Sequence, residues 1–407
     1  MRKIIIVGAG QAGLQLGVGL LDAGYDVTIV SNRTGDQIRN GKVMSSQCMF
    51  GGALARERAL GLNLWDAECP PVEGISFTVP DGEGGKAISW ASRVDVPAQS
   101  VDQRVKMPAW IAEFERRGGK LEPADAGVDD LETYTREADL VVVAAGKGDI
   151  AKLFTRDAGR STYDAPQRAL ALTYVNGLTP RPEHSAVSFN LVPGVGEYFV
   201  FPALTTSGPC EIMVFEGVPG GPFDSWGDVR TPAEHLAHSR ALLQQYLPWE
   251  AERATDVTLT DDNGILAGRF PPTVRHPVGV LPSGAVVLGL ADVVVLNDPI
   301  TGQGSNNASK CAASYLNSIL EHRDAPFDAA FMQATFERYW DYARYVAEWT
   351  NALLAPPPPH VLDLLGAAGA NPRIARRFAN GFDDPRDFHH WFLDPAAAAA
   401  YLAEAAA

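Results

Sequence analysis

The stretch KIIIVGAGQAG (3–13) decides the fold of this chain. Its first part, KIIIV (3–7), is typical of a strand buried on both faces of a parallel sheet. The residues LQLGVGLLDAGY (14–25) predict a helix, and DVTIV (26–30) predicts a second strand. The stretch therefore opens a β-α-β unit with Gly-x-Gly-x-x-Gly at its first turn.

Each glycine of this turn has a physical reason. Gly8 permits the tight turn, Gly10 lets the backbone approach a pyrophosphate, and Gly13 lets the helix pack closely on the strand. The free N–H groups at the start of the helix, around Gln11 and Ala12, would meet the phosphate charge. The turn therefore predicts a dinucleotide site.

The end of the second strand departs from this pattern. A strand in this position should end in Asp or Glu, which binds the ribose hydroxyls, but Ser31-Asn32-Arg33 stands there. The loss should weaken adenosine binding by at most about 3 kcal/mol, the scale of one charge-assisted hydrogen bond. An exchangeable cofactor is expected. Arg33 and Lys42 are candidate phosphate contacts, with solvated surface charge as the alternative.

A distant segment indicates which dinucleotide is bound. AVVLGL (285–290) predicts a strand, and Asp292 at its end could accept hydrogen bonds from a ribityl chain. The turn Pro299-x-x-Gly302-Gln303-Gly304 precedes a helix expected to run to about Ile319. Such a turn can present backbone N–H groups to the electron-rich pyrimidine edge of a flavin ring. NAD needs no second clamp of this kind, so the two segments together predict FAD.

The motif order resembles a known family. Gly-x-Gly-x-x-Gly, an Arg-containing helix (VDQR, 101–104), a strand-end Asp and P-x-x-GQG-x-N, with Asn306 as its last residue, are similar to flavoprotein monooxygenases of the para-hydroxybenzoate hydroxylase fold. Within that fold, NDP (297–299) before the GQG turn, VDQR and WTN (349–351) resemble the two-component styrene/indole monooxygenases. The resemblance implies that Arg104 contacts the FAD phosphates or ring.

The resemblance also implies a reaction and a partner. Single-component aromatic hydroxylases carry an Asp-Gly motif where this chain has GKGDI (146–150), so no NAD(P)H site is expected. A separate NAD(P)H:FAD reductase would then deliver reduced FAD. With O2 this forms a C4a-hydroperoxyflavin, which epoxidises a small apolar aromatic substrate of the indole or styrene type. The alternative is a single-component NAD(P)H-dependent hydroxylase whose motif has drifted.

Candidate substrate-pocket residues come from two regions. Members of the family that prefer indole carry Ser, Gln and Met at alternating positions after the second strand, and this chain has Ser45, Gln47 and Met49. Alternation would place the three on one face of a strand. Three further residues fit the same subgroup, namely Val72, Ile75 and Ala98. In the predicted antiparallel strands of 186–204 and 211–216, the candidates are Phe199, Phe201 and Pro202.

The predicted fold class is α/β, in three parts. A discontinuous Rossmann-like FAD-binding domain covers 1–75, 100–150 and 275–322. An inserted antiparallel-sheet domain that binds substrate covers 76–99 and 151–274. A helical region, 323–407, is broken at Pro356–Pro359 and ends in an Ala-rich tail expected to fray.

Composition excludes other classes. The chain has 34 basic and 49 acidic residues and a net charge of −15, so nucleic acid and anionic membrane surfaces are poor partners. No apolar run is long enough for a membrane span. The four cysteines lack the short spacing of a metal site, and a reducing cytoplasm is expected. A flavin-dependent halogenase is disfavoured because Trp-x-Trp-x-Ile-Pro is absent. A non-catalytic FAD carrier and a homodimer stay open.

Overall fold

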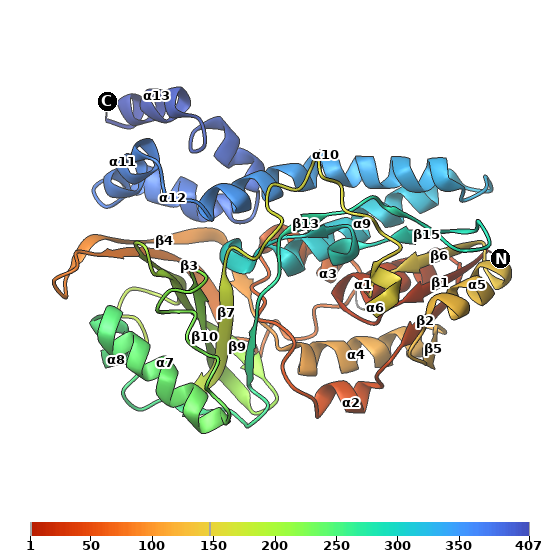
Figure 1. The fold of residues 1–407 in the computed structure, drawn as a ribbon, viewed down its shortest axis with the longest axis horizontal. Helices are drawn as coiled ribbons and strands as arrows, with labels where there is room; N and C mark the ends of the chain where they lie inside the picture. Colours follow the sequence, from red (N-terminus) through yellow and green to blue (C-terminus); the bar gives the residue numbers. More distant parts are fainter. Residues whose placement is uncertain (1, 146–147, 407) are drawn as a thin grey trace.

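A computed structural model describes residues 2–145 and 148–406 (Figure 1). Its first layer is a six-stranded sheet with the strand order β14-β15-β6-β1-β2-β5. The strands are β1 (Lys3–Val7), β2 (Asp26–Ser31), β5 (Lys120–Pro123), β6 (Leu140–Val143), β14 (Val278–Val280) and β15 (Val286–Gly289). The predicted α/β class and the distant strand 285–290 are confirmed, because β15 pairs in parallel with β6.

The β-α-β unit forms as the glycine pattern predicts. β1 and β2 pair in parallel, and α1 (Gln11–Asp22) connects them. The apolar side chains of β1 and most residues of α1 are buried in one hydrophobic core, to which helices and strands both contribute. Helices α4 (Gln103–Arg116) and α9 (Gly304–His322) pack against α1, so residues from three distant segments surround the carboxyl ends of the parallel strands.

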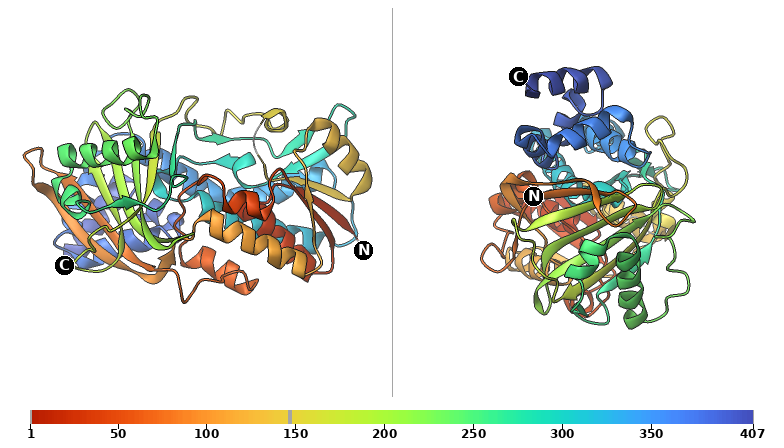
Figure 2. Two further views of the ribbon diagram at one scale, coloured as in Figure 1. Left: turned by 90° about the horizontal axis from the view of Figure 1, so that it is seen from below. Right: turned by 90° about the vertical axis from the view of Figure 1, so that its left-hand side faces the viewer.

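A second, eight-stranded sheet lies beside the first one (Figures 1 and 2). Its order is β11-β7-β10-β9-β8-β3-β4, with β12 also on β7. The strands are β3 (Pro71–Pro80), β4 (Lys86–Gln99), β7 (Ala169–Asn176), β8 (Ala186–Val192), β9 (Gly196–Thr205), β10 (Gly208–Gly217), β11 (Thr258–Leu259) and β12 (Ile265–Gly268). The sheet begins at Pro71, before the boundary expected at residue 75, and β3 pairs in parallel with β8.

The large sheet is covered on both faces because its strands alternate between two cores. α7 (Pro232–Tyr246) and α8 (Pro248–Arg253) cover one face, against which Phe215 and Met213 pack. The opposite face carries Ile212, Val214 and the phenylalanines of β9, and the C-terminal helices cover part of it (Figure 1). The remaining part faces the six-stranded sheet, where the site described below lies.

The C-terminal region is helical, as predicted. α10 (Ala329–Leu353) crosses from the first core to the second, and the chain then forms α11 (Pro359–Ala368), α12 (Pro372–Gly381), η3 (Pro385–His390) and α13 (Pro395–Ala406). The prediction of a frayed Ala-rich tail is wrong. Ala398 is fully buried and the Tyr401 ring packs 5.0 Å from the Trp391 ring, because the tail has an apolar partner to fold against.

Three further features bear on function. All four cysteines are free and buried. Within residues 2–145 and 148–406, no group of His, Cys, Asp or Glu could hold a metal ion. Over the same ranges, every helix is too short or too polar to cross a membrane.

Candidate active site

One cavity of about 890 Å³ lies between the two sheets. Its polar end is lined by the glycine-rich turn, by the ends of β2 and β5, and by the segments around Asp292 and Gly304. Its other end is lined by apolar side chains of the large sheet. The volume lies in the range typical of ligand sites, and the cavity joins two chemically different halves.

The glycine-rich turn has the geometry that a pyrophosphate requires. Gly8 has a φ of +121°, and a Cβ there would lie 2.9 Å from the carbonyl carbon of Ala144. A Cβ on Gly13 would lie 2.0 Å from the carbonyl oxygen of Gly8. A Cβ on Gly10 would meet nothing within 4 Å, because this glycine faces the open cavity at the start of α1. The turn, with Gln11 and Ala12, lines the cavity.

A carboxylate that the sequence prediction missed lies near the end of β2. Asn32 and Arg33 line the cavity, and so does Asp125, which follows the adjacent strand β5. The two segments are joined by a hydrogen bond from the Ala124 N–H to the Ser31 carbonyl, at 2.9 Å. The sequence places Asp125 just after a short predictable strand. Only the strand order of the folded sheet shows that this strand lies next to β2. Lys42 is exposed and lies outside the cavity lining.

Asp292 reaches the cavity through an unusual backbone conformation. Ala291, two residues after the end of β15, has a φ of +55°, which is rare for a residue with a side chain. Asp292 and Arg275 both line the cavity. The Asp292 carboxylate contacts solvent there, yet protein surrounds it closely. Burial raises its pKa to about 6, and the positive charge of Arg275 offsets part of the rise.

The GQG segment forms a short 3-10 turn, η2 (Pro299–Thr301), followed by the start of α9. Gly302 has a φ of +62°, and its N–H donates to the Pro299 carbonyl at 2.7 Å, so this N–H is not free for a ligand. Pro299, Gly302 and Gly304 line the cavity. The first N–H groups of α9 have no partner within the helix and lie at this wall.

Two residues of this segment that were predicted to bind the cofactor instead form hydrogen bonds to the backbone of other segments. The Gln303 amide nitrogen donates to the Phe382 carbonyl at 2.8 Å, and the side chain is fully buried. Asn306 accepts from the Phe50 N–H at 2.9 Å and donates to the Cys48 carbonyl at 2.8 Å. The structure places neither in the cavity lining.

The polar end fits a flavin dinucleotide. Gly10 leaves room for the pyrophosphate, and the start of α9 offers N–H donors at the opposite wall. The Asn297 amide nitrogen is buried at this wall and has no hydrogen-bond partner among the described residues. A carbonyl oxygen of a ligand would satisfy it. Gly146 and Lys147, at the position where single-component hydroxylases carry Asp-Gly, lie outside the described residues.

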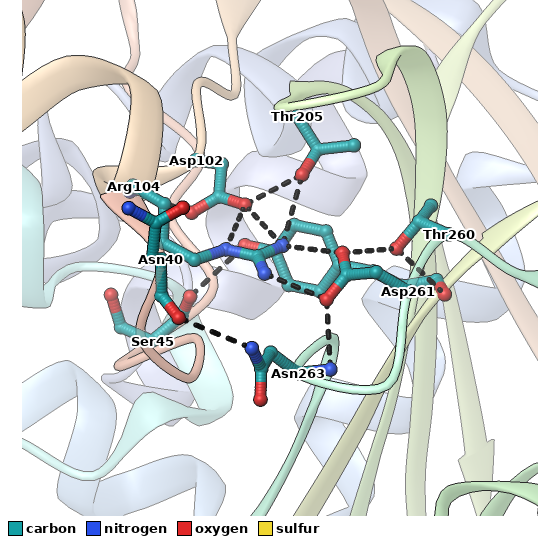
Figure 3. Close-up of polar contacts among 9 residues, drawn as sticks. Asn40, Ser45, Asp102, Arg104, Thr205, Thr260, Asp261 and Asn263 are labelled. Carbon is teal, nitrogen blue, oxygen red and sulfur yellow. Dashed lines mark hydrogen bonds and ion pairs between the residues drawn. The ribbon is translucent and has the colours of Figure 1, made fainter. Parts of the chain in front are cut away.

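The structure does not bring Arg104 to the cavity. Its guanidinium donates to both oxygens of Asp261, at 2.9 and 3.0 Å, and to Asp102 and Thr205 (Figure 3). Asn263 extends this network by donating to the Asn40 carbonyl. The sequence gives no sign of Asp261, which lies 157 residues later in the chain. Arg104 therefore joins α4 to the large sheet.

The apolar end of the cavity is built mainly by alternate residues of the large sheet. These are Leu170, Val187, Phe199, Phe201, Val214 and Leu266. Pro202 is absent from the lining because it follows Phe201 directly, and successive residues of a strand point to opposite faces. One acidic residue, Glu216, also belongs to this wall, and the sequence prediction missed it. The apolar stretch EIMVFE (211–216) carries a Glu at each end, and the second of these, Glu216, was the available signal.

The indole-type residues are dispersed. Residues 45–48 form no strand, so the expected alternation on one strand face does not occur. Ser45 lines the cavity, and its hydroxyl donates to the Gln47 amide oxygen at 3.1 Å. The other five lie outside the lining: Gln47, Met49, Val72, Ile75 and Ala98 are buried in the surrounding core.

A parallel nucleotide-binding sheet, a large second sheet and a helical C-terminus define the fold of flavin-dependent hydroxylases and halogenases. A flavoprotein/dehydrogenase from Cytophaga hutchinsonii superposes with a TM-score of 0.67 at 14% identity, covering 99% of both chains. The flavin-dependent brominase Bmp2 gives a TM-score of 0.65 at 13% identity, also over 99% of both. These structures show the fold alone.

Sequence similarity identifies the family. The chain is 30% identical over 403 residues to the styrene monooxygenase StyA of Pseudomonas fluorescens, covering 97% of this chain and 96% of the relative. Residues 146–253 match the family described as "Styrene monooxygenase A putative substrate binding domain". The chain belongs to the styrene monooxygenase StyA family and is a flavin-dependent monooxygenase.

Proposed function

We propose that this protein is the oxygenase component of a two-component system, which epoxidises the carbon–carbon double bond of an aryl alkene or heteroaromatic compound. One observation carries the proposal: the cavity is polar at the glycine-rich turn and apolar at the large sheet, without a break between the two. A dinucleotide at the polar end would place its reactive ring beside a chamber for a small apolar substrate.

Several residues would hold the cofactor. The turn Gly8–Gly13 would bind the pyrophosphate, Arg33 would contact a phosphate, and Asp125 would bind the ribose in place of the missing strand-end carboxylate. Asp292 would accept hydrogen bonds from the ribityl chain, and the first N–H groups of α9, at Gly304, would face the pyrimidine edge. Reduced FAD bound there supplies the two electrons that activate O2 and the site of oxygen transfer.

The protein's own contribution is positioning and exclusion of water. Phe199, Phe201 and Val214 give the chamber an apolar wall, which keeps water from diverting activated oxygen to H2O2. The chemistry requires no acid–base pair of the protein. In this proposal the strands of the large sheet form the substrate-binding domain and the six-stranded sheet forms the FAD-binding domain.

The partner and the substrate belong to the same proposal. An NAD(P)H:FAD reductase would supply reduced FAD, on the resemblance to two-component monooxygenases. Indole is favoured over styrene, on the similarity of Ser45, Gln47 and Met49 to the indole-oxidising subgroup; Ser45 is the one of the three at the cavity wall. Free, buried thiols at all four cysteines support a cytoplasmic location.

The test supplies reduced FAD without any reductase. Anaerobic protein with chemically reduced FAD is mixed with aerated buffer that contains indole or styrene, with catalase present to remove H2O2. Styrene oxide, or indigo from indole, is expected. Reoxidation of all reduced FAD without an oxygenated product would overturn the proposal. In a second reaction, the protein with NADH, FAD and substrate should not oxidise NADH; rapid NADH oxidation would instead favour the single-component hydroxylase.

A further inference from the structure

Glu216 is an acidic residue in an otherwise apolar wall. It lies on β10, lines the cavity, and is 1% exposed. Its neighbours on the same face of the sheet include Val214 on its own strand and Leu170 on β7. An aliphatic side chain would pack there without the cost of removing a carboxyl group from water. A buried acid at a cavity wall therefore requires an explanation.

Glu216 belongs to a cluster with more acids than bases. Glu197 stands directly opposite it on β9, and like charges in that position repel. Arg168 neutralises Glu197 through two hydrogen bonds of 2.6 and 2.9 Å. Asp298, which caps the η2 turn by accepting from the Ile300 N–H at 3.1 Å, is the third acid of the cluster.

The surroundings of Glu216 favour its protonated form. Burial raises the pKa of Glu216 well above its ordinary value, and the charges of Asp298 and Glu197 raise it further. The protonated carboxyl of Glu216 donates to Asp298. Glu216 is thus a neutral acid in which the oxygen without the proton remains an acceptor.

That acceptor has no hydrogen-bond partner in the part of the chain that the structure describes. The Glu216 Oε2 atom is buried and receives no hydrogen bond from the described residues. The surrounding chamber residues, such as Phe199, Val214 and Leu266, have no side-chain N–H or O–H to offer. A ligand that brings an N–H into the chamber would satisfy it.

We propose that Glu216 is a specificity-determining residue of the chamber, whose carboxyl accepts a hydrogen bond from the ring N–H of a bicyclic aryl alkene such as indole. The inference rests on the proposed function, because it names the substrate feature that the same chamber selects. Asp298 acts as a positioning residue: it holds the Glu216 proton away from the ligand and links the substrate wall to the turn before Gly302.

The experiment compares two ligands of almost the same shape. Indole and indene both carry a double bond in a fused five-membered ring, but indene has CH2 where indole has N–H. Their dissociation constants are measured by titration calorimetry on the full chain loaded with oxidised FAD, so the readout does not depend on turnover. We expect indole to bind about tenfold more tightly than indene, the scale of one hydrogen bond to a buried acceptor. Equal affinities would overturn the inference.

Three variants assign the difference to Glu216. In Glu216→Met the indole preference should fall to about one while indene still binds, whereas Glu216→Gln keeps a carbonyl acceptor and should retain the preference. Glu211→Met is the matched control, because Glu211 lies on the same strand but on the opposite face. A preference that survives in Glu216→Met would overturn the inference. If Glu216→Met fails to fold, 1-methylindole on the unaltered protein replaces it, and binding as tight as that of indole would overturn the inference.

This outcome is separable from that of the proposed function. Equal affinities together with oxygenation of both compounds would overturn the role of Glu216 alone. A tenfold preference for indole without any oxygenated product would support the role of Glu216 in binding and count against the epoxidase proposal alone.

Discussion

The Arg104 guanidinium forms two parallel hydrogen bonds with the Asp261 carboxylate, at 2.9 and 3.0 Å, and so joins helix α4 to the segment between β11 and β12. Asp102 lies on the other side of the guanidinium, and both Arg104 and Asp102 are almost completely buried. Bidentate pairs of this kind fix geometry as well as charge. The ion pair therefore joins the two halves of the molecule directly.

Arg104→Met should destabilise the protein without changing the affinity for FAD. The variant would leave Asp102 as a buried charge without its cation, which costs about 3–5 kcal/mol of stability. The cost of leaving Asp261 unpaired is smaller, because its side chain is partly exposed. Denaturant unfolding measures the loss, and FAD fluorescence quenching at low temperature measures affinity. The double variant Arg104→Met/Asp102→Asn should recover part of the stability. A selective loss of FAD affinity would show that Arg104 contacts the cofactor after all.

Gly10→Ala and Gly13→Ala should separate binding from folding. A Cβ at Gly10 meets no protein atom within 4 Å, so the cofactor-free protein should melt at an unchanged temperature while FAD affinity falls by about tenfold or more. A Cβ at Gly13 would lie 2.0 Å from the Gly8 carbonyl oxygen, so this variant should lose stability, by about 1–3 kcal/mol or more. Equal melting temperatures for the two variants would contradict the geometry.

Asp125→Ala should weaken FAD binding but not FMN binding. Asp125 lines the cavity beside the end of β2, where the adenosine part of a dinucleotide would lie, and FMN lacks that part. Loss of a hydrogen bond to a charged group costs about 1.5–3 kcal/mol. Asp129→Ala, an exposed change in the first turn of α5 (Val128–Glu137), is the matched control. A parallel loss for FAD and FMN would place Asp125 elsewhere in the site.

Asp292→Asn should stabilise the cofactor-free protein at high pH and weaken FAD binding. The folded-state pKa of about 6 lies above the ordinary 3.8, so the folded state binds more protons between these values. Stability of the unaltered protein therefore falls as pH rises through this window and stays lower above it. The melting-temperature advantage of the variant should be largest at about pH 8 and vanish near pH 4. An advantage that grows on acidification would contradict the sign of the shift.

Phe199→Ser should increase the share of reduced FAD that is reoxidised without forming an oxygenated product. Phe199 lines the chamber, and a hydroxyl there would admit water and raise the share of O2 converted to H2O2. Val200→Ser, the next residue of β9, lies in the core on the other face of the sheet and serves as the matched control. It should lower stability while the ratio of product to H2O2 stays unchanged. An equal rise of H2O2 in both variants would contradict the assignment of the chamber wall.

Local patterns predicted the parts of the fold that depend on neighbouring residues. Residues 3–30 contain an apolar run, a glycine-rich turn, a helical pattern and a second apolar run, and this local pattern was enough to predict β1, α1 and β2. The GQG turn predicted the start of α9 for the same reason. Residues whose role depends on remote partners could not be assigned. Asn306 binds the 48–50 segment, and the side chains of Gln47 and Met49 point into protein because residues 45–48 form no strand.

The order of strands along the chain has a consequence for how the molecule must be made. Going from one end to the other, the backbone leaves the parallel sheet after β2, returns at β5, leaves again after β6 and returns at β14. No cut at a single peptide bond would separate the two sheets from each other with all of their strands. During synthesis the large sheet cannot be completed until β12 (Ile265–Gly268) has emerged, and the six-stranded sheet cannot be completed until β15 (Val286–Gly289) has emerged. Truncated or split forms should therefore aggregate rather than yield a working flavin module.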